Sequence, residues 1–234
     1  LARAAGECVG VDAISQRTLV GTGNYTISSF VGANLTITAK ELTVSGITVD
    51  NKVYDGGTDA TLNTSSAVLN GIVGSDDVTL DASAYTATFA SAGVGNDIAV
   101  TVSGLGLSGA QAGNYTLIQP TGLTGNITAK GVIVTADAKS KVYGEADPAF
   151  TYSSSDPAAT FAGALARAAG EGVGVYAINQ GTLVGTGNYT ISSFVGANLT
   201  ITAKGVIVTA DAKSKVYGEA DPALTYSSSD PAAT

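Results

Sequence analysis

The residue types that most often carry out chemistry in proteins are scarce in this sequence. Its 234 residues contain no histidine, which removes the commonest general base and the commonest transition-metal ligand. The one cysteine, Cys8, is too few for a disulfide framework or a thiolate zinc site. We therefore expect no catalytic, cofactor-binding or metal-binding residues and no enzymatic activity, although two carboxylates brought together by folding would reopen that question.

One glycine-rich segment has the spacing of a dinucleotide-binding loop. Gly104, Gly106 and Gly109 follow an apolar stretch in the pattern G-x-G-x-x-G. In a dinucleotide site that pattern leads into a helix whose N-terminus faces the pyrophosphate. Residues 110–115 are too few for such a helix before the next expected strand. We interpret the segment as a glycine-rich turn.

Acidic side chains offer a second possibility, because calcium binds six to eight oxygens from carboxylates and carbonyls. Asp76, Asp77 and Asp81 form one candidate group, and Asp55 and Asp59 form another. Neither has EF-hand spacing or the nonapeptide repeat of calcium-binding β-rolls. We favour solvated loop acids; an interdomain calcium ion and a cross-link between lysine and asparagine stay open as alternatives.

Charge and hydropathy exclude two kinds of partner. Eleven basic and nineteen acidic side chains give a formal net charge of −8, so binding of nucleic acid through its phosphates is not expected. No apolar run approaches the roughly 20 residues that span a bilayer, so no membrane span is expected in this segment. The chain begins at Leu1 and contains no methionine, which we interpret as an internal piece of a longer protein.

Internal repeats determine the organisation. Residues 1–40 recur at 165–204 with four changes, and residues 131–160 recur at 205–234 with one. We therefore place a complete module at 131–204, the C-terminal part of such a module at 1–40 and the N-terminal part of a further one at 205–234. The changes are Cys8 to Gly172, Asp12 to Tyr176, Ser15 to Asn179, Arg17 to Gly181 and Phe150 to Leu224.

A second kind of module occupies residues 41–130 and shares the plan of the first. It carries K-V-Y-D-G at 52–56, where the complete repeat carries K-V-Y-G at 141–144. Near its end it carries G-N-Y-T at 113–116, which matches 187–190. Two module types with one plan indicate an old duplication followed by a recent one.

The two terminal fragments together lack only four residues of a whole module, those that match Phe161-Ala162-Gly163-Ala164. The C-terminal fragment of one chain could therefore complete the N-terminal fragment of the next, as in assemblies built by strand donation. Contacts of this heterologous kind produce filaments when they do not close. An arbitrary boundary within a continuous run of repeats is the equally weighted alternative.

Alternation of apolar and polar residues predicts short antiparallel strands throughout, with turn residues at the spacing typical of sandwiches. The predicted fold class is all-β, with tandem Ig-like β-sandwich modules in a linear array. Asp156 and Pro157 could instead cap a helix over 156–169, which would give β-grasp-like modules with one short helix; we favour a strand. Tyr143 and Tyr189 are expected to bury their rings while their hydroxyls hold neighbouring loops.

These residues carry a resemblance to two known families. The K-V-Y-D-G module at 41–130 resembles the YDG domain of bacterial surface proteins. The module at 131–204, with K-V-Y-G-E-A-D-P, L-A-R-A-A-G-E and G-N-Y-T-I, resembles the MBG domain of the YGX type. Both occur in tandem in large secreted proteins of the filamentous-haemagglutinin and adhesin kind. The resemblance implies an extracellular, cell-surface or secreted repeat with an Ig-like β architecture and no catalytic residues.

The leading functional hypothesis is structural: a stalk or fibre shaft of a bacterial adhesin or surface filament. Its expected partners are neighbouring copies of the same chain or repeat, joined head-to-tail, and a host or environmental surface. The alternative is an array of carbohydrate- or surface-binding modules, which Tyr85 or Tyr176 exposed on one flat face would favour.

Overall fold

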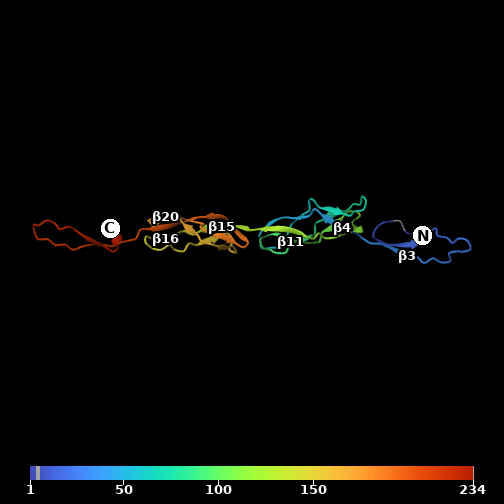
Figure 1. Ribbon diagram of the computed structural model, residues 1–234, viewed down its shortest axis with the longest axis horizontal. Coiled ribbons are helices and arrows are strands. Elements are labelled where there is room, and N and C mark those ends of the chain that lie inside the picture. The colour runs from blue at the N-terminus through green and yellow to red at the C-terminus, as the bar shows by residue number, and fades with distance from the viewer. Residues whose placement is uncertain (4–5, 234) are drawn as a thin grey trace. The chain divides into compact units, whose positions relative to one another are not determined.

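The structure is a computed structural model that describes residues 1–3 and 6–233 (Figure 1). Ala4, Ala5 and Thr234, which belong to the two predicted terminal fragments, lie outside the described residues. Where the chain is described it is all-β, with no α-helix and two short 3-10 turns, η1 (Ala112–Asn114) and η2 (Pro231–Ala233). The all-β prediction is confirmed. The chain divides into two compact units, Leu1–Lys130 and Gly131–Thr234.

Residues 41–130, the first module, form two main sheets and two strand pairs. The main sheets have the strand orders β13-β4-β8 and β10-β11-β14-β6, and the pairs are β12-β9 and β5-β7. β13 pairs with β4 and β14 pairs with β6 in parallel. The strands are β4 (Lys40–Ser45), β5 (Thr48–Val49), β6 (Lys52–Val53), β7 (Leu62–Asn63), β8 (Val68–Asn70), β9 (Thr79–Asp81), β10 (Thr86–Phe89), β11 (Gly95–Ser103), β12 (Gly106–Ser108), β13 (Tyr115–Leu117) and β14 (Leu123–Thr128).

Residues 131–204, the second module, repeat this strand order. Their sheets run β17-β15-β22 and β16-β23-β20-β19, with β18-β21 as a separate pair, and β16 pairs with β23 in parallel. These three sheets match three of the first module, as the shared motifs predict, and the pair β5-β7 is described in the first module alone. The strands are β15 (Lys130–Ala136), β16 (Lys139–Val142), β17 (Tyr152–Ser154), β18 (Thr160–Ala162), β19 (Ala166–Arg167), β20 (Gly174–Asn179), β21 (Val184–Thr186), β22 (Tyr189–Val195) and β23 (Ala197–Thr202).

The predicted alternation of residues places one face of each strand in a core. Ala87 and Phe89 of β10 are buried while the threonines between them are exposed. In β15 the buried residues Val132, Val134 and Ala136 alternate with exposed ones in the same way. Since the core residues are mostly Val, Ile, Leu and Ala, branched side chains on paired strands supply most of the apolar packing.

The segment that competed for a helix forms strands. Asp156 starts a turn, in which the Ala158 backbone N–H donates to its carboxylate at 3.0 Å. The chain then enters β18 and β19 across Gly163, whose φ is +86° and whose added Cβ would lie 2.1 Å from the Thr182 carbonyl oxygen. A helix cannot form across that turn, so the helical alternative is wrong for 156–169.

The tyrosines differ in how far their rings are buried. Tyr115 is buried, its hydroxyl donating to Asp76 Oδ2 at 2.6 Å and accepting from the Val73 N–H at 3.0 Å, as expected for a ring that holds a loop. Tyr189 is partly buried against the core of the second module. Tyr143 is 51% exposed, so the prediction is wrong there. Its counterpart Tyr54, which likewise follows the last residue of its strand, packs against the core of the first module.

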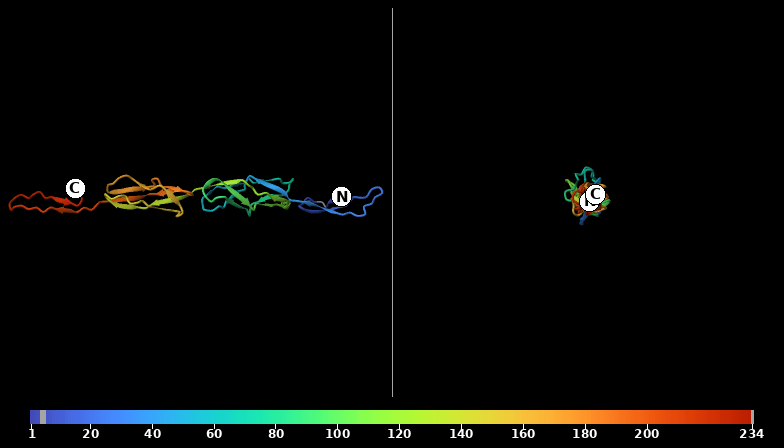
Figure 2. Two further views of the ribbon diagram at one scale, coloured as in Figure 1. Left: turned by 60° about the horizontal axis from the view of Figure 1, so that its bottom comes forward. Right: turned by 90° about the vertical axis from the view of Figure 1, so that its left-hand side faces the viewer.

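Two terminal fragments complete the chain, and Figure 2 shows each as a narrow hairpin. The tail half-module, residues 1–40, carries the sheet β1-β2-β3, made of β1 (Ala2–Arg3), β2 (Gly10–Ser15) and β3 (Ala33–Ile37). The head half-module, residues 205–233, carries the pair β24 (Val208–Ala210) and β25 (Tyr226–Ser228). Both keep the register of their copies in the second module, but most of their large apolar side chains are exposed.

Equivalent leucines in the whole and the half-module provide a matched stability test. Leu199 is 0% exposed, whereas its repeat counterpart Leu35 is 41% exposed. We expect Leu199→Ala to lower the unfolding free energy of the second module by about 2–5 kcal/mol, because it leaves a cavity in a closed core. Leu35→Ala should change neither module by more than about 1 kcal/mol. Calorimetry at low protein concentration measures both, and equal losses would contradict the structure.

Candidate functional site

The acidic residues that could have bound calcium serve as loop acceptors instead. Asp77 accepts from the Ala110 N–H at 3.2 Å, Asp81 from the Ser83 N–H at 2.9 Å, and Asp55 from the Gly57 N–H at 2.8 Å. Within residues 1–3 and 6–233, no three His, Cys, Asp or Glu side chains gather closely enough to hold a metal ion. The Asp59 carboxylate is outside any such group, and Cys8 is exposed.

The glycine-rich segment 104–109 has a structural explanation. Gly104 and Gly109 have φ values of +77° and +108°, and an added Cβ on Gly109 would lie 2.3 Å from the Asp77 carbonyl oxygen. Between them runs strand β12, so the interpretation as a turn alone was incomplete. The chain continues into η1, which is too short to bind a pyrophosphate at its N-terminus.

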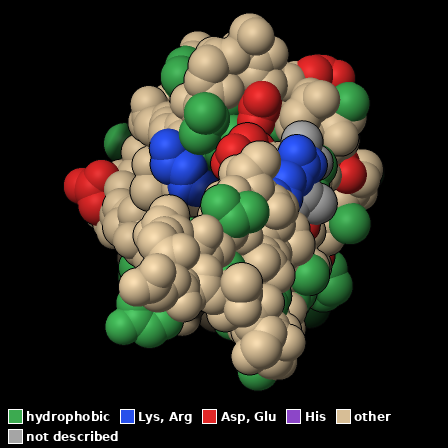
Figure 3. Space-filling model, turned by 90° about the vertical axis from the view of Figure 1, so that its right-hand side faces the viewer, with side chains coloured by type: hydrophobic (Ala, Val, Ile, Leu, Met, Phe, Trp, Pro, Cys, Tyr) green, Lys and Arg blue, Asp and Glu red, His purple; other side chains and the backbone are tan. Residues whose placement is uncertain are grey.

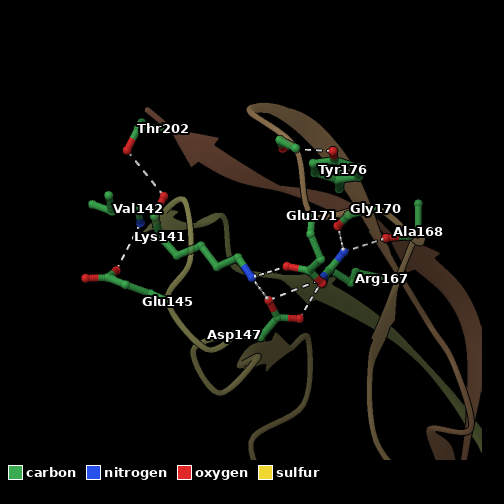
Figure 4. Close-up of polar contacts among 11 residues, drawn as sticks. Lys141, Val142, Glu145, Asp147, Arg167, Ala168, Gly170, Glu171, Tyr176 and Thr202 are labelled. Carbon is green, nitrogen blue, oxygen red and sulfur yellow. Dashed lines mark hydrogen bonds and ion pairs between the residues drawn. The ribbon is translucent and has the colours of Figure 1, made fainter. Parts of the chain in front are cut away.

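An ion-pair network of four side chains lies in the second module (Figure 4). Lys141 is the one charged residue that is buried in the described part of the chain. Its Nζ lies 2.7 Å from Asp147 Oδ1 and 2.7 Å from Glu171 Oε2. Arg167 closes the network, with Nε 2.6 Å from Asp147 Oδ2 and Nη2 donating to Glu171. Four charges of alternating sign therefore meet at one place.

The elements that position these side chains come from both halves of the module. Lys141 lies on β16, opposite Ile201 of β23, and Asp147 lies in the loop that follows β16. Arg167 lies on β19, and Glu171 lies in the loop that leads to β20. The network thus joins the part that recurs as the head half-module to the part that recurs as the tail half-module.

Further contacts fix the Arg167 guanidinium in place. Its Nη1 donates to the carbonyl oxygens of Ala168 at 3.0 Å and Gly170 at 2.5 Å. Its Cζ lies 5.5 Å from the centre of the Tyr176 ring, and the Tyr176 hydroxyl donates to the Gly172 carbonyl oxygen at 2.8 Å. A guanidinium held by carbonyls and a ring is pre-oriented to bind a carboxylate through two nitrogens.

The charges hold one another in their ionised states. Hydrogen bonds from Arg167 and then Lys141 lower the pKa of Asp147 from its ordinary 3.8 to about 2. Lys141 and Arg167 also lower the pKa of Glu171, and the two carboxylates raise the pKa of Lys141. The network is therefore an electrostatic connection between the two halves.

Comparison with known families agrees with this picture of related modules. Residues 38–122 match the YDG domain, and residues 132–200 and 206–233 match the MBG domain of the YGX type. The chain carries tandem YDG and MBG domains. No curated protein and no solved structure matches it. Both are non-catalytic, repeat-type domains typical of surface or secreted proteins. No helix of the described residues is long and apolar enough for a bilayer span.

The YDG domain uses the corresponding lysine in a related way. Lys52 Nζ lies 2.8 Å from Asp55 Oδ1 and donates to the carbonyl oxygens of Gly57 at 3.0 Å and Asp59 at 3.1 Å. It also lies 5.9 Å from the centre of the buried Phe89 ring. The sequence analysis did not identify either lysine as a cation that joins the beginning of its domain to the end. The signal was present, because the K-V-Y motif recurs in both domains at the strand, β6 or β16, that pairs in parallel with the final strand of the domain.

The incomplete MBG copies contain the same four charges. In the tail half-module Arg3 pairs with Glu7, and its Nη1 lies 3.0 Å from Asp12 Oδ2. In the head half-module Lys215 Nζ lies 2.5 Å from Asp221 Oδ1. Each half-module therefore keeps the ion pair that the complete MBG domain forms within that half, Lys141 with Asp147 or Arg167 with Glu171, and lacks the two pairs that cross between the halves.

The lowered pKa of Asp147 predicts how the stability of the MBG domain depends on pH. A depressed folded-state pKa adds stability above the unfolded value of 3.8 and loses it as the pH falls toward about 2. We expect the melting temperature of the MBG domain to fall between about pH 4 and pH 2, and Asp147→Asn to flatten that decline. Circular dichroism melts across this range measure the effect. Asp50→Asn in the YDG domain is the control, and an unchanged decline in Asp147→Asn would contradict the assignment.

Proposed function

We propose that this chain is part of the structural repeat region, a stalk or fibre shaft, of an extracellular bacterial adhesin or surface filament. The observation that carries the proposal is repetition: two domain types with one strand order, and near-identical copies of one of them along a single chain. The families involved are compatible with a repeat or adhesin-like surface protein.

Physical reasoning favours a structural role for such repetition. In a chain of domains each domain has its own core, so every further copy adds length. The stability of the array is then roughly the sum of the contributions of its domains. Repeated copies also supply reach and multivalency, whereas a catalyst gains little from identical neighbours. The polar cluster around Lys141 connects two parts of a domain and leaves its carboxylates paired rather than poised for acid–base chemistry.

The proposal includes head-to-tail assembly, in which a neighbouring chain completes a split terminal module. Exposed apolar side chains in both half-modules support it, because several of them, Leu19, Leu35 and Val208, correspond to buried residues of the complete copy. Further partners of such a region are a host or environmental surface.

The alternative, an array of carbohydrate-binding modules, would need a flat aromatic face. Tyr85 and Tyr176 were the rings that could have formed it, and both pack against cores. The Tyr85 hydroxyl accepts from the Leu62 N–H, and the Tyr176 ring lies beside Arg167. On the face shown in Figure 3, hydrophobic side chains occur in small separate groups. These observations favour the structural role.

Labelling of the native cells tests the proposed location. Antibodies against residues 41–130 should decorate intact, unpermeabilised cells or shed fibres in immunogold electron microscopy, because a stalk lies outside the cell. An antibody against a cytoplasmic enzyme serves as the control for intact membranes. Labelling that requires permeabilisation would contradict the proposal.

A further inference from the structure

We propose that the YDG and MBG domains are built to bear tension along the chain. In each domain the first and last segments run side by side in parallel, so a pull on the two ends of the domain loads the pairing between them in shear. This rests on the proposed stalk role, because a shaft that joins a cell to a surface transmits force through its backbone. It adds to that role the element that carries the load.

The YDG domain shows the parallel course of its two ends in both main sheets. In one sheet β4 pairs in parallel with β13, with Lys40 opposite Tyr115. In the other β6 pairs in parallel with β14, with Val53 opposite Thr128. The separation in sequence is 75 residues at both places. The first and last segments of the domain therefore keep one register along its length.

The MBG domain repeats this arrangement. β16 pairs in parallel with β23, with Lys139 opposite Leu199. In the other sheet β22 is the neighbour of β15, and the Ser192 hydroxyl donates to the Val132 carbonyl oxygen at 3.1 Å. The separation is 60 residues in both sheets, as a parallel course of the two segments requires.

The direction of the strands determines how they are loaded. Tension enters a domain at its first strand and leaves at its last; β14 ends at Thr128 and β15 begins at Lys130, so the backbone passes from one domain to the next through a single residue. Parallel neighbours have the same direction, so the pull draws the first segment backward and the last segment forward along one line. The hydrogen bonds between them are then strained together and not one after another, and their resistances add.

Two hydrogen bonds hold the last residue of β23, where tension leaves the MBG domain. That residue is Thr202, whose carbonyl oxygen accepts from the Tyr143 N–H at 2.8 Å and whose hydroxyl donates to the Lys141 carbonyl oxygen at 3.3 Å. Lys141 is itself held by ion pairs with Asp147 and Glu171. The strand that receives the load is therefore anchored in the domain.

The YDG domain has the same two bonds at the same place. Thr128 ends β14, its carbonyl oxygen accepts from the Tyr54 N–H at 2.8 Å, and its hydroxyl donates to the Lys52 carbonyl oxygen at 3.3 Å. The side-chain partners of the two lysines differ between the domains, whereas these bonds do not. The bonds at the end of the final strand are thus what the two domains share at this point.

Unfolding at constant force tests the inference on the full 234-residue chain, held through peptide tags at its two ends. Each domain should open in one step, and the YDG domain (41–130) should give a longer step than the MBG domain (131–204), since each residue released adds about 3.3–3.6 Å. Tyr143→Pro removes the N–H that binds Thr202 and should make the MBG domain unfold about fivefold faster under force. The YDG step of the same molecule should keep its rate and serves as an internal reference.

Ala168→Pro is the matched control. Tyr143 and Ala168 each follow the last residue of a strand, so the preceding residue is already extended, as proline requires. The Ala168 N–H donates to the Ala177 carbonyl oxygen at 2.9 Å, beside β19 and β20, which are not terminal strands. We expect Ala168→Pro to lower the melting temperature of the MBG domain but to change its unfolding rate under force by less than about twofold, because that rate depends on the bonds that the force breaks first.

A gentler pair of variants covers the case in which proline prevents folding. Thr202→Val removes the hydroxyl bond to Lys141 and should speed MBG unfolding under force by about twofold or more. Thr200→Val, on the same exposed face of β23, should leave the rate unchanged. Equal effects of Tyr143→Pro and Ala168→Pro under force would overturn the inference. If the proline variants give no MBG step, equal effects of the two valine variants would overturn it.

These outcomes are separate from those of the stalk proposal. Equal effects within each pair, together with labelling of intact cells, would remove the load-bearing element and leave the stalk. Unequal effects together with labelling that requires permeabilisation would leave the mechanical property of the domains and remove the stalk.

Discussion

Each module of this chain depends on a parallel strand pair that joins its beginning to its end. β6 lies on β14 in the YDG domain, and β16 lies on β23 in the MBG domain. Parallel strands cannot be joined by a tight hairpin, so such a pair forms only when distant parts of the chain meet. The core therefore closes only when both halves are present. The exposed apolar residues of the two half-modules are the direct consequence.

In both domains a lysine lies on the first strand of this parallel pair, Lys52 on β6 and Lys141 on β16. Removing a cation from water is costly unless charged or polar partners surround it, so a buried lysine fixes which groups must face it. Lys52 is met by one carboxylate, two carbonyl oxygens and an aromatic ring, whereas Lys141 is met by two carboxylates. The two domains thus keep the cation and its place in the sheet while they change its partners.

One of the residues that differ between the MBG copies also acts on a charged side chain of the network. Tyr176 lies beside Arg167 in the complete domain, and Asp12 binds Arg3 at the same place in the tail half-module. Both keep the guanidinium in position, one through a ring face and the other through a carboxylate. Cys8, where the complete copy has Gly172, is exposed and needs no such explanation.

Much of the fold was predictable from the sequence, because it follows from local alternation and from repetition. The threonines of β10 and the valines of β15 have the period of half-buried strands, and the repeats indicate which segments share a structure. The Ig-like topology and the module boundaries remain predictions. The repeated motif singles out Lys141, but its partners were not predictable, since the network joins two loops and two strands that only the folded sheet order brings together. The exposure of Tyr143 was missed because the shared motif does not distinguish it from Tyr54, which packs against the core of the first module.

The most direct test of this dependence on the parallel pair is hydrogen exchange at β23 and at its repeat counterpart β3. In the described residues β23 pairs with both β16 and β20, whereas β3 pairs with β2 alone. At low protein concentration the backbone amides of β23 that face β16 should therefore be protected, while their counterparts in Leu35–Thr38 exchange rapidly. Equal exchange at the two strands would show that the parallel pair does not close the module, and would contradict the account.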